Sequence, residues 1–436
     1  YYGAMYGGST TSVLVNIPGE AASVVTCLDG YEMAKKGRAG PALGIAAFGS
    51  FIAGTASIIG LMLLAPPLAD MALKFGPPEY TTLMILGLTV LTFLVKGSML
   101  KALMMAAFGM FLSTVGLDAV SGVARFSFDR AELMDGIGLV PVVMGLFGIS
   151  EVLLNLEKTI SKEILKSKLS GFMPTKEDWR LCFRPILRGS FIGFFLGIVP
   201  GGGAILASFV AYAVEKRVSK HPENFGTGMI EGVAAPEAAN NSATGGAFIP
   251  LLTLGIPANV VMAILLGAMM IHGLQPGPNL INEHPDVFWG VIASMYLGNG
   301  MLLILNLPLI PLWVQVLKVP YGLFFPLILL FCLIGAYSIS FAVFDILIMI
   351  VFGIIGYLMK KTDYEGAPLV LALVLGNLFE NALRQSLMLS DGSFLIFFNR
   401  PIAASFLWVA IALLMIPLLP LFKKPRPAAV GMKSPD

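Results

Sequence analysis

The segment 231–274 constrains the fold more than any other part of the chain, because it is apolar at both ends and polar in the middle. The middle ends in two glycines and consists largely of small polar residues: Asn240, Asn241, Ser242, Thr244, Gly245 and Gly246. Gly255-Ile256-Pro257 interrupts the segment again. Polar side chains and free backbone groups are costly in lipid unless they line a cavity or are buried in protein. The segment therefore predicts a transmembrane helix that is broken in its middle at a substrate or ion site.

A second copy of this pattern stands near the start of the chain. Tyr6-Gly7-Gly8 corresponds to Thr244-Gly245-Gly246, and Asn16-Ile17-Pro18-Gly19 corresponds to Gly255-Ile256-Pro257-Ala258. The offset is 238 residues from Gly7 to Gly245 and 239 residues from Pro18 to Pro257. Because an apolar helix follows each copy at nearly the same spacing, we expect an internal duplication.

Composition places the chain in a membrane. Of its 436 residues 57% are hydrophobic and 12% are charged, and the mean hydropathy is +0.85. Soluble domains carry about 25% charged residues, so the composition predicts an all-α polytopic membrane protein. The three cysteines form no CxxC pair and indicate neither a disulfide framework nor a zinc site. The sequence has no HExxH, GxSxG or P-loop motif, so an enzyme is not predicted. The net charge of +2 does not point to a nucleic-acid partner.

Apolar segments near the length of a membrane crossing recur along the chain. The two broken helices lie at 1–30 and 231–274, and further crossings are expected at about 41–65, 79–95, 101–117, 137–156, 287–317, 320–339, 343–359, 367–388 and 403–422. Together they amount to about 11 crossings of ~20 residues each.

Basic residues orient these crossings, because cytoplasmic loops are enriched in lysine and arginine. The linker 157–188 holds the densest basic run, and residues 35–38 and 423–426 are also basic, which places all three in the cytoplasm. The exit 275–286 has no lysine or arginine and faces outward. The loop 118–136 is placed outside although it holds two arginines. The first broken helix then ends inside and the second ends outside, which is typical of two inverted-topology repeats.

Four parts follow from these patterns. The first inverted repeat spans 1–157, and its N-terminal hairpin, with a Pro-Gly-rich tip, is expected to be missing. A basic cytoplasmic linker spans 158–185, the second inverted repeat spans 186–395, and a terminal transmembrane helix with a basic cytoplasmic tail spans 396–436. The second repeat begins with two apolar arms of about a dozen residues around Pro200, Gly201, Gly202 and Gly203. Such arms do not span ~30 Å at 1.5 Å per residue, which favours a re-entrant hairpin; one crossing kinked at Pro200 is the alternative.

The chain resembles the large membrane subunit of the tripartite tricarboxylate transporters over essentially its whole length. The most specific motifs are YYGAMYGGSTTSVLVNIPGEAASVVTCLDGYEMAKKG, IVPGGG and EGVAAPEAANNSATGGAFIPLLTLGIPAN. The resemblance implies secondary active uptake of small tri- or dicarboxylates across the bacterial inner membrane, coupled to sodium or protons. It implies two partners, a small transmembrane subunit and a periplasmic solute-binding protein. An elevator-like movement follows only by analogy at the level of the fold.

A carboxylate substrate needs hydrogen-bond donors, which half-helix N-termini, hydroxyls and amides provide. The predicted substrate ligands are Ser9, Thr10, Thr11 and Asn16 in the first repeat and Asn240, Asn241, Ser242, Thr244, Thr253 and Asn259 in the second. A coupling sodium ion prefers oxygen ligands, and unwound carbonyls near Gly7, Gly8, Gly245, Gly246 and Gly202 are predicted to supply them. Pro200, Gly201, Gly202 and Gly203 are predicted to form a gate. No other cofactor is expected.

Each assignment has an alternative. Small polar residues in membrane helices often only permit close packing or bond to neighbouring backbone. Glu151 and Glu380 are either proton-coupling groups or scaffold residues with ion-pair partners. Glu231 and Glu237 flank the site in capping, orienting or substrate-binding roles. A stand-alone carboxylate carrier and an anion channel remain alternative functions, and a channel is unable to concentrate its solute.

Overall fold

The computed structural model describes residues 1–16, 18–94, 98–118, 121–157, 173–200, 203–310, 312 and 321–415. Within these ranges the chain is almost entirely helical, with one small antiparallel sheet of β1 (Gly116–Leu117) and β2 (Ala124–Arg125). The predicted all-α polytopic class is therefore confirmed. Part of the linker, the tip glycines Gly201 and Gly202, and the tail from residue 416 lie outside the described residues.

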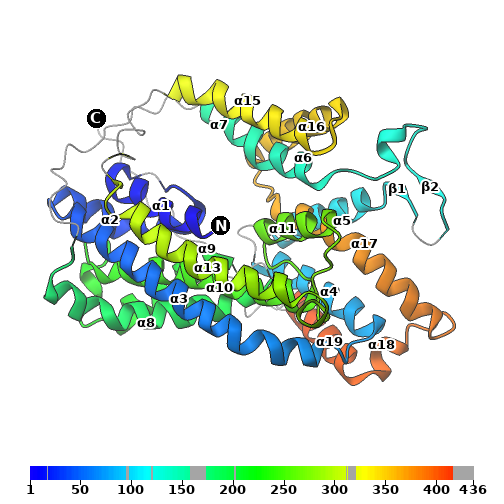
Figure 1. Cartoon of the computed structure of the whole chain (residues 1–436), viewed down its shortest axis with the longest axis horizontal. Helices are drawn as coiled ribbons and strands as arrows, with labels where there is room; N and C mark the ends of the chain where they lie inside the picture. Colours follow the sequence, from blue (N-terminus) through cyan, green and yellow to red (C-terminus); the bar gives the residue numbers. More distant parts are fainter. Residues whose placement is uncertain are drawn as a thin grey trace.

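Six helices in the described ranges are long and apolar enough to cross a membrane (Figure 1). They are α3 (Ala39–Ala72), the continuous helix Leu139–Glu157, α8 (Lys176–Ile198), α13 (Pro285–Asn306), α16 (Val343–Lys361) and α17 (Ala367–Met388). The helix Leu139–Glu157 consists of α6 (Leu139–Val143), the π-helical turn η3 (Met144–Ile149) and α7 (Ser150–Glu157). Helices that are shorter, broken or less apolar occupy most of the other expected crossings.

These remaining helices have the following bounds: α1 (Tyr2–Val15), α2 (Val24–Lys35), α4 (Pro77–Leu94), α5 (Met99–Ser113), α9 (Gly203–Val218), α10 (Glu231–Leu254), α11 (Val260–Ile271), α12 (Leu280–Glu283), α15 (Tyr321–Ser340), α18 (Ile396–Asn399) and α19 (Pro401–Met415). Short 3₁₀ turns are η1 (Ala21–Ser23), η2 (Ala131–Leu133) and η4 (Pro222–Asn224).

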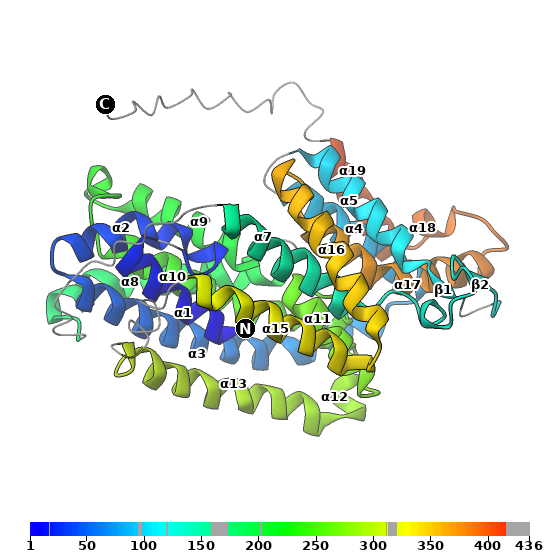
Figure 2. The same cartoon turned by 90° about the horizontal axis from the view of Figure 1, so that it is seen from above.

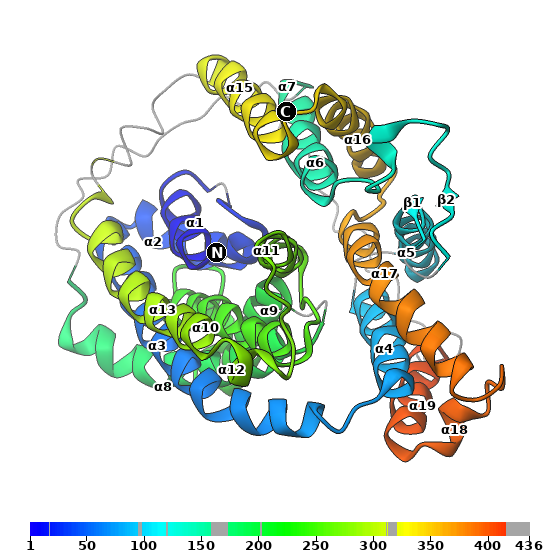
Figure 3. The same cartoon turned by 45° about the vertical axis from the view of Figure 1, so that its right-hand side comes forward.

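The helices pack in two groups (Figure 3). In the first group α10 is enclosed by α1, α2, α3, α8 and α9, and α13 runs along the outside of α3 (Figure 2). The second group holds α4, α5, α17, α18 and α19, with α6, α7, α15 and α16 beside them. The helix α11 connects the two groups, because it follows α10 in the chain and packs on α17 and α6. The central helix of the fold is thus the one that carries the polar run.

Small residues allow α8 to pack closely on α10. A Cβ atom on Gly189, Gly193 or Gly197 of α8 would lie 2.3, 2.1 or 2.2 Å from a carbonyl oxygen of α10. Those oxygens belong to residues spaced by four on the facing side of α10: Ala235, Ala239 and Ala243. Glycine at every fourth position therefore brings the two backbones into direct contact, as small residues do at membrane helix interfaces.

The arms around Pro200 form a hairpin. Arg188 on α8 donates two hydrogen bonds to Glu215 on α9, at 2.9 and 2.5 Å, so α9 returns alongside α8. A single crossing kinked at Pro200 is therefore wrong. The first arm is longer than predicted, because α8 begins at Lys176 and runs through the expected boundary at residue 186. A capping box of Thr175 and Asp178 starts this helix inside the basic linker.

Candidate functional site

The described residues on either side of Pro18 and of Pro257 share several local features. Each preceding helix ends in a left-handed residue, Asn16 (φ 54°) after α1 and Gly255 (φ 69°) after α10. In both, the N–H of that residue bonds the carbonyl five positions earlier. A helix restarts three residues after the proline, as η1 in one copy and α11 in the other. All these positions are offset by 239 residues, so at both places a left-handed residue, a proline and a new helix start follow one another at the same spacing.

The paired glycines are not breaks. α1 runs unbroken through Gly7 and Gly8, and α10 through Gly245 and Gly246, so the prediction that their carbonyls are unwound is wrong. A Cβ atom on Gly245 would lie 2.1 Å from Ser57 Oγ, and one on Gly246 would lie 2.3 Å from the carbonyl oxygen of residue 194. Three of the four glycines are sites of close packing, and only Gly7 has open space around it.

Different groups cap the helices that restart after the breaks. Glu20 is the N-cap of η1, and its carboxylate accepts a hydrogen bond from the N–H of Ala22. Asn259 is the N-cap of α11, and its Oδ1 accepts from the N–H of Met262 at 3.1 Å. The N-terminus of η1 is therefore capped by a carboxylate of the protein, whereas the N-terminus of α11 is capped by a neutral amide. An anion is favoured at the second of these N-termini.

Tyr1 connects the two breaks. Asn259 Nδ2 donates to the Tyr1 hydroxyl at 3.1 Å. The same hydroxyl interacts with the Thr244 side chain and, electrostatically, with Glu20. Side chains from the second break and from the middle of α10 therefore meet at the Tyr1 hydroxyl.

The polar run of α10 is fully enclosed. Asn240, Asn241, Ser242 and Thr244 are at most 1% exposed. Asn241 Nδ2 donates to Ser50 Oγ on α3 at 2.7 Å and to Asn240 Oδ1 at 2.6 Å. The Asn241 Oδ1 atom is buried without a hydrogen-bond partner in the described structure. The two asparagines thus form a buried amide pair that retains an open acceptor.

The hydroxyls of this region bond mainly to nearby backbone. Ser242 donates to the Ser190 carbonyl of α8 at 2.6 Å. Thr244 and Thr253 each donate to the carbonyl four residues earlier, at 3.0 and 2.8 Å. These bonds match the packing alternative for Ser242 and Thr253, whereas Thr244 also reaches Tyr1.

Among the predicted ligands of the first repeat, two bond to nearby backbone and one ends the helix. Ser9 and Thr10 are buried on α1, and Ser9 donates to the Tyr6 carbonyl at 2.8 Å. Thr11 is half-buried and donates to the Gly8 carbonyl at 3.3 Å, beside the break loop at Gly19. Asn16 is exposed and takes the left-handed position. The structure does not bring these four side chains together at Tyr1.

The described residues of the hairpin contact the first break and the second helix group. Pro200 follows α8 in a turn, and Gly203 starts α9 with φ 50°. Ser208 of α9 donates to the Ala22 carbonyl at 2.8 Å, which holds the hairpin against η1. A Cβ atom on Gly87 of α4 would lie 3.9 Å from Pro200. Gly201 and Gly202 lie outside the described residues, and the gate stays a prediction.

Sequence reasoning did not single out Asp29, which holds α2 to the start of α10. Its Oδ1 accepts from the N–H groups of Gly226, Gly228 and Met229 at 2.8 to 2.9 Å, and its Oδ2 accepts from Tyr212 at 2.9 Å. An isolated Asp in an amphipathic segment gave no signal for this role, because its partners lie about 200 residues along the chain.

Glu151 and Glu380 have ion-pair partners in the scaffold. Lys360 pairs with Glu151 at 2.5 Å, and Arg125 and Arg384 each approach Glu380 to 2.7 Å. Arg384 also pairs with Asp118 at 2.8 Å, so the loop before β2 is fixed to α17. The alternative of scaffold pairing is therefore confirmed for both glutamates.

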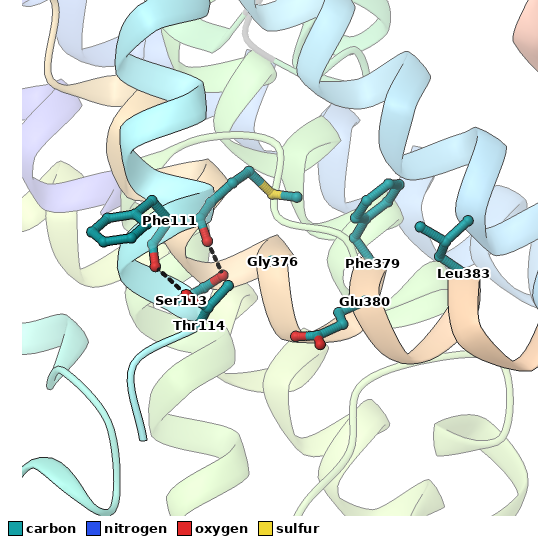
Figure 4. Close-up of a pocket in the computed structure, with 8 residues that line it drawn as sticks. Phe111, Ser113, Thr114, Gly376, Phe379, Glu380 and Leu383 are labelled. Carbon is teal, nitrogen blue, oxygen red and sulfur yellow. Dashed lines mark hydrogen bonds between the residues drawn. The ribbon is translucent and has the colours of Figure 1, made fainter. Parts of the chain in front are cut away.

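A pocket of about 280 Å³ lies between α5 and α17, away from both breaks (Figure 4). Its Ser113 and Thr114 hydroxyls donate to carbonyls of their own helix at 2.7 Å. Its carboxylate, Glu380, is ion-paired as described above. The polar groups of this pocket are bonded within the protein, and none of its lining residues belongs to the predicted site.

Comparisons with known proteins identify a family and two relatives. The model of the family described as "Tripartite tricarboxylate transporter TctA family" matches residues 1–371. An uncharacterized 52.8 kDa protein in the TAR-I ttuC' 3' region of Agrobacterium vitis is 51% identical over 426 residues, which is 98% of this chain and 85% of the relative. An uncharacterized protein in the TAR-II ttuC' 3' region of the same organism is 51% identical over 234 residues, or 54% of this chain and 97% of the relative. No solved structure matches.

The helical fold and its long apolar helices are those of a multi-pass membrane protein. The family match covers most of the chain, and the chain belongs to the tripartite tricarboxylate transporter TctA family.

Proposed function

We propose that this protein takes up small tri- or dicarboxylates across the bacterial inner membrane by cation-coupled alternating access. It receives them from a periplasmic solute-binding protein and works with a small transmembrane subunit. Family membership supports the transport of tricarboxylates, and the break at Pro257 carries the proposal for the site.

That break offers donors where a carboxylate needs them. Residues 255–258 are buried, and α11 begins immediately after them with its N–H groups directed back at the break. Asn259 adds an amide N–H, and Tyr1 adds a hydroxyl beside it. We therefore place one substrate carboxylate group at the N-terminus of α11. Residues 240–242 are buried and hydrogen-bonded to neighbouring helices, and in this proposal they hold α10 in place next to the site.

The two helix groups suggest how the site changes sides. The substrate break lies where α10 leaves the first group and α11 packs on the second. The hairpin tip at Pro200 lies beside α4 of the second group. A movement of one group against the other, elevator-like in the extreme case, would carry the break past this tip. In this proposal the 157–188 linker and the C-terminus are cytoplasmic.

The test is uptake of radiolabelled citrate and succinate into proteoliposomes that hold the full-length protein and its small subunit. We expect accumulation above the external concentration only with an inward sodium or proton gradient and with the binding protein outside. Accumulation without the binding protein would identify a stand-alone carrier. Labelled citrate that only equilibrates, whatever the gradient, would identify a channel and overturn the proposal.

A further inference from the structure

Two carboxylates lie at the first break with neutral surroundings. Glu237 on α10 is 0% exposed; its Oε1 accepts from the Thr26 hydroxyl and its Oε2 accepts from Asn240 Nδ2 at 3.3 Å. Glu20 bonds Ala22 through Oε2, and its Oε1 is buried without a hydrogen-bond partner in the described structure. Within the described part of the chain, neither has a lysine or arginine among its partners.

The two carboxylates bond to groups one helical turn apart. Glu20 accepts from the Ala22 N–H of η1, and Glu237 accepts from the Thr26 hydroxyl of α2. The Cys27 thiol next to Thr26 is the other titratable group on this side. The other bonded neighbours of the Glu237 carboxylate are neutral, Thr26 and Asn240, and Ser50 of α3 donates to the Glu237 backbone carbonyl. Two like charges enclosed by neutral groups disfavour ionisation unless a positive charge joins them.

We infer that Glu20 and Glu237 hold the coupling cation, an assignment that rests on the function proposed above. The available oxygen atoms are the unpartnered Glu20 Oε1, the Glu237 carboxylate and the Thr26 hydroxyl. Such hard oxygen donors suit a sodium ion or a proton. The described residues contain no group of three or more His, Cys, Asp and Glu side chains that could hold a metal ion, so a transition metal is not implied.

The position of Glu20 explains how the cation controls substrate binding. Glu20 acts electrostatically on the Tyr1 hydroxyl, to which Asn259 donates at the second break. Without the cation, the negative charge of Glu20 opposes a carboxylate at Asn259. With the cation in place that charge is neutralised and the carboxylate binds. Because binding linkage is reciprocal, the carboxylate strengthens cation binding by the same factor.

The first test needs no substrate. The Tm of the full-length protein is measured in sodium chloride and in choline chloride at equal ionic strength and at several pH values. A cation that binds only the folded state raises Tm. We expect sodium or acid to raise the Tm of the wild type and of Glu283→Gln, a control at an exposed glutamate of α12. We expect Glu20→Gln and Glu237→Gln to be more stable in choline and to lose the rise. The assignment is overturned if Glu20→Gln and Glu237→Gln show the same rise in Tm with sodium and with acid as the wild type.

The second test measures the affinity for citrate. We expect the wild type to bind citrate at least tenfold more tightly with the coupling cation, and Glu20→Gln to bind equally with and without it. A response to sodium at fixed pH identifies sodium, and a response to acid without sodium identifies the proton.

If Glu237→Gln does not fold, Glu237→Asp must shift the half-saturating cation concentration, and an unchanged value overturns the assignment. If the wild type binds no carboxylate but the variants lose the cation effect on Tm, the proposed function fails and the cation site stands.

Discussion

At the residue scale, the identity of the cap decides what each break is able to bind. Glu20 and Asn259 occupy equivalent positions, each two residues after the proline, but one is an anion and the other is a neutral amide. A carboxylate at an N-cap satisfies the helix dipole from within the protein, whereas an amide leaves the positive end for a ligand. This difference in the caps is the basis for proposing two unlike sites, one for a cation and one for a carboxylate.

The buried amide of Asn241 is predicted to stabilise the fold. Replacing Asn241 by Ala removes donors from Ser50 and Asn240 and leaves buried oxygen atoms unpaired. Because an unsatisfied buried group costs about 1–3 kcal/mol, we expect a clearly lower Tm in detergent. Asn306→Ala is the control, since Asn306 is half-buried on α13 and donates only within its own helix. Equal Tm values for the two variants would contradict the assigned role.

Sequence reasoning reached some of these residues and missed others for physical reasons. Asn259 was predictable, because an amide after Gly-Ile-Pro-Ala matches a helix N-cap. Glu20 carries a weaker signal of the same kind, since Ser23 follows three residues later in a capping box. The contact between Thr26 and Glu237 joins residues 211 positions apart, and a single sequence does not encode such a pairing locally.

At the element scale, glycine has two roles in this chain that composition alone does not separate. Gly255 takes a left-handed conformation and ends a helix, whereas Gly245 and Gly246 lie inside the same helix and permit close contacts. The proline that follows distinguishes the two cases, because it has no N–H to continue the helix. Breaks were therefore predicted correctly at Gly-Ile-Pro and incorrectly at Gly-Gly.

The close contact of α8 with α10 predicts an intolerant position. A methyl group at Gly193 would lie 2.1 Å from the Ala239 carbonyl oxygen, so Gly193→Ala must push the helices apart. We expect a large fall in Tm and in the yield of monodisperse protein. Gly290→Ala on α13 has open space around the added methyl group and should be neutral or slightly stabilising. A Gly193→Ala variant as stable as Gly290→Ala would show that the contact is not as tight as described.

The left-handed residues at the two breaks predict opposite responses to substitution. Gly255→Ala places a Cβ at φ 69° and 2.5 Å from the Pro276 carbonyl oxygen. The conformation alone costs about 1–2 kcal/mol, so we expect a lower Tm and weaker uptake. Asn16→Gly relieves the same conformation at the first break and should leave Tm unchanged or raise it. Thermal unfolding checks both, and a stable Gly255→Ala variant would show that the second break does not need the left-handed turn.

At the scale of the whole molecule, the positions of the crossings were predicted better than their lengths. Apolar runs mark where helices lie, but α8 extends into the basic linker because its charged side chains are partnered: Arg38 binds Asp178 and Arg188 binds Glu215. The packing of α10 inside five other helices was not predictable, since a polar run at membrane depth does not show which helices cover it. Its small side chains instead let neighbours approach from every side.

The inverted-repeat hypothesis predicts opposite sides for equivalent ends. Lys35 ends the helix that follows the first break, and Glu283 lies in the exit after the second, and both are exposed. In intact cells we expect a membrane-impermeant maleimide to label Glu283→Cys from outside and to label Lys35→Cys only after the membrane is opened. The three native cysteines are first replaced by serine or alanine. Labelling of both positions from the same side would contradict an inverted topology.

The central claim is that a substrate carboxylate binds at the break after α10, and equilibrium binding of citrate by the purified full-length protein tests it most directly. The measurement compares the wild type with Asn259→Ala and with Asn306→Ala in a sodium-containing buffer. Asn259→Ala removes the helix cap and the amide that reaches Tyr1, so we predict at least a tenfold weaker affinity, equivalent to about 1.4 kcal/mol. Asn306→Ala should bind like the wild type. Unchanged affinity in a folded Asn259→Ala variant would contradict the account.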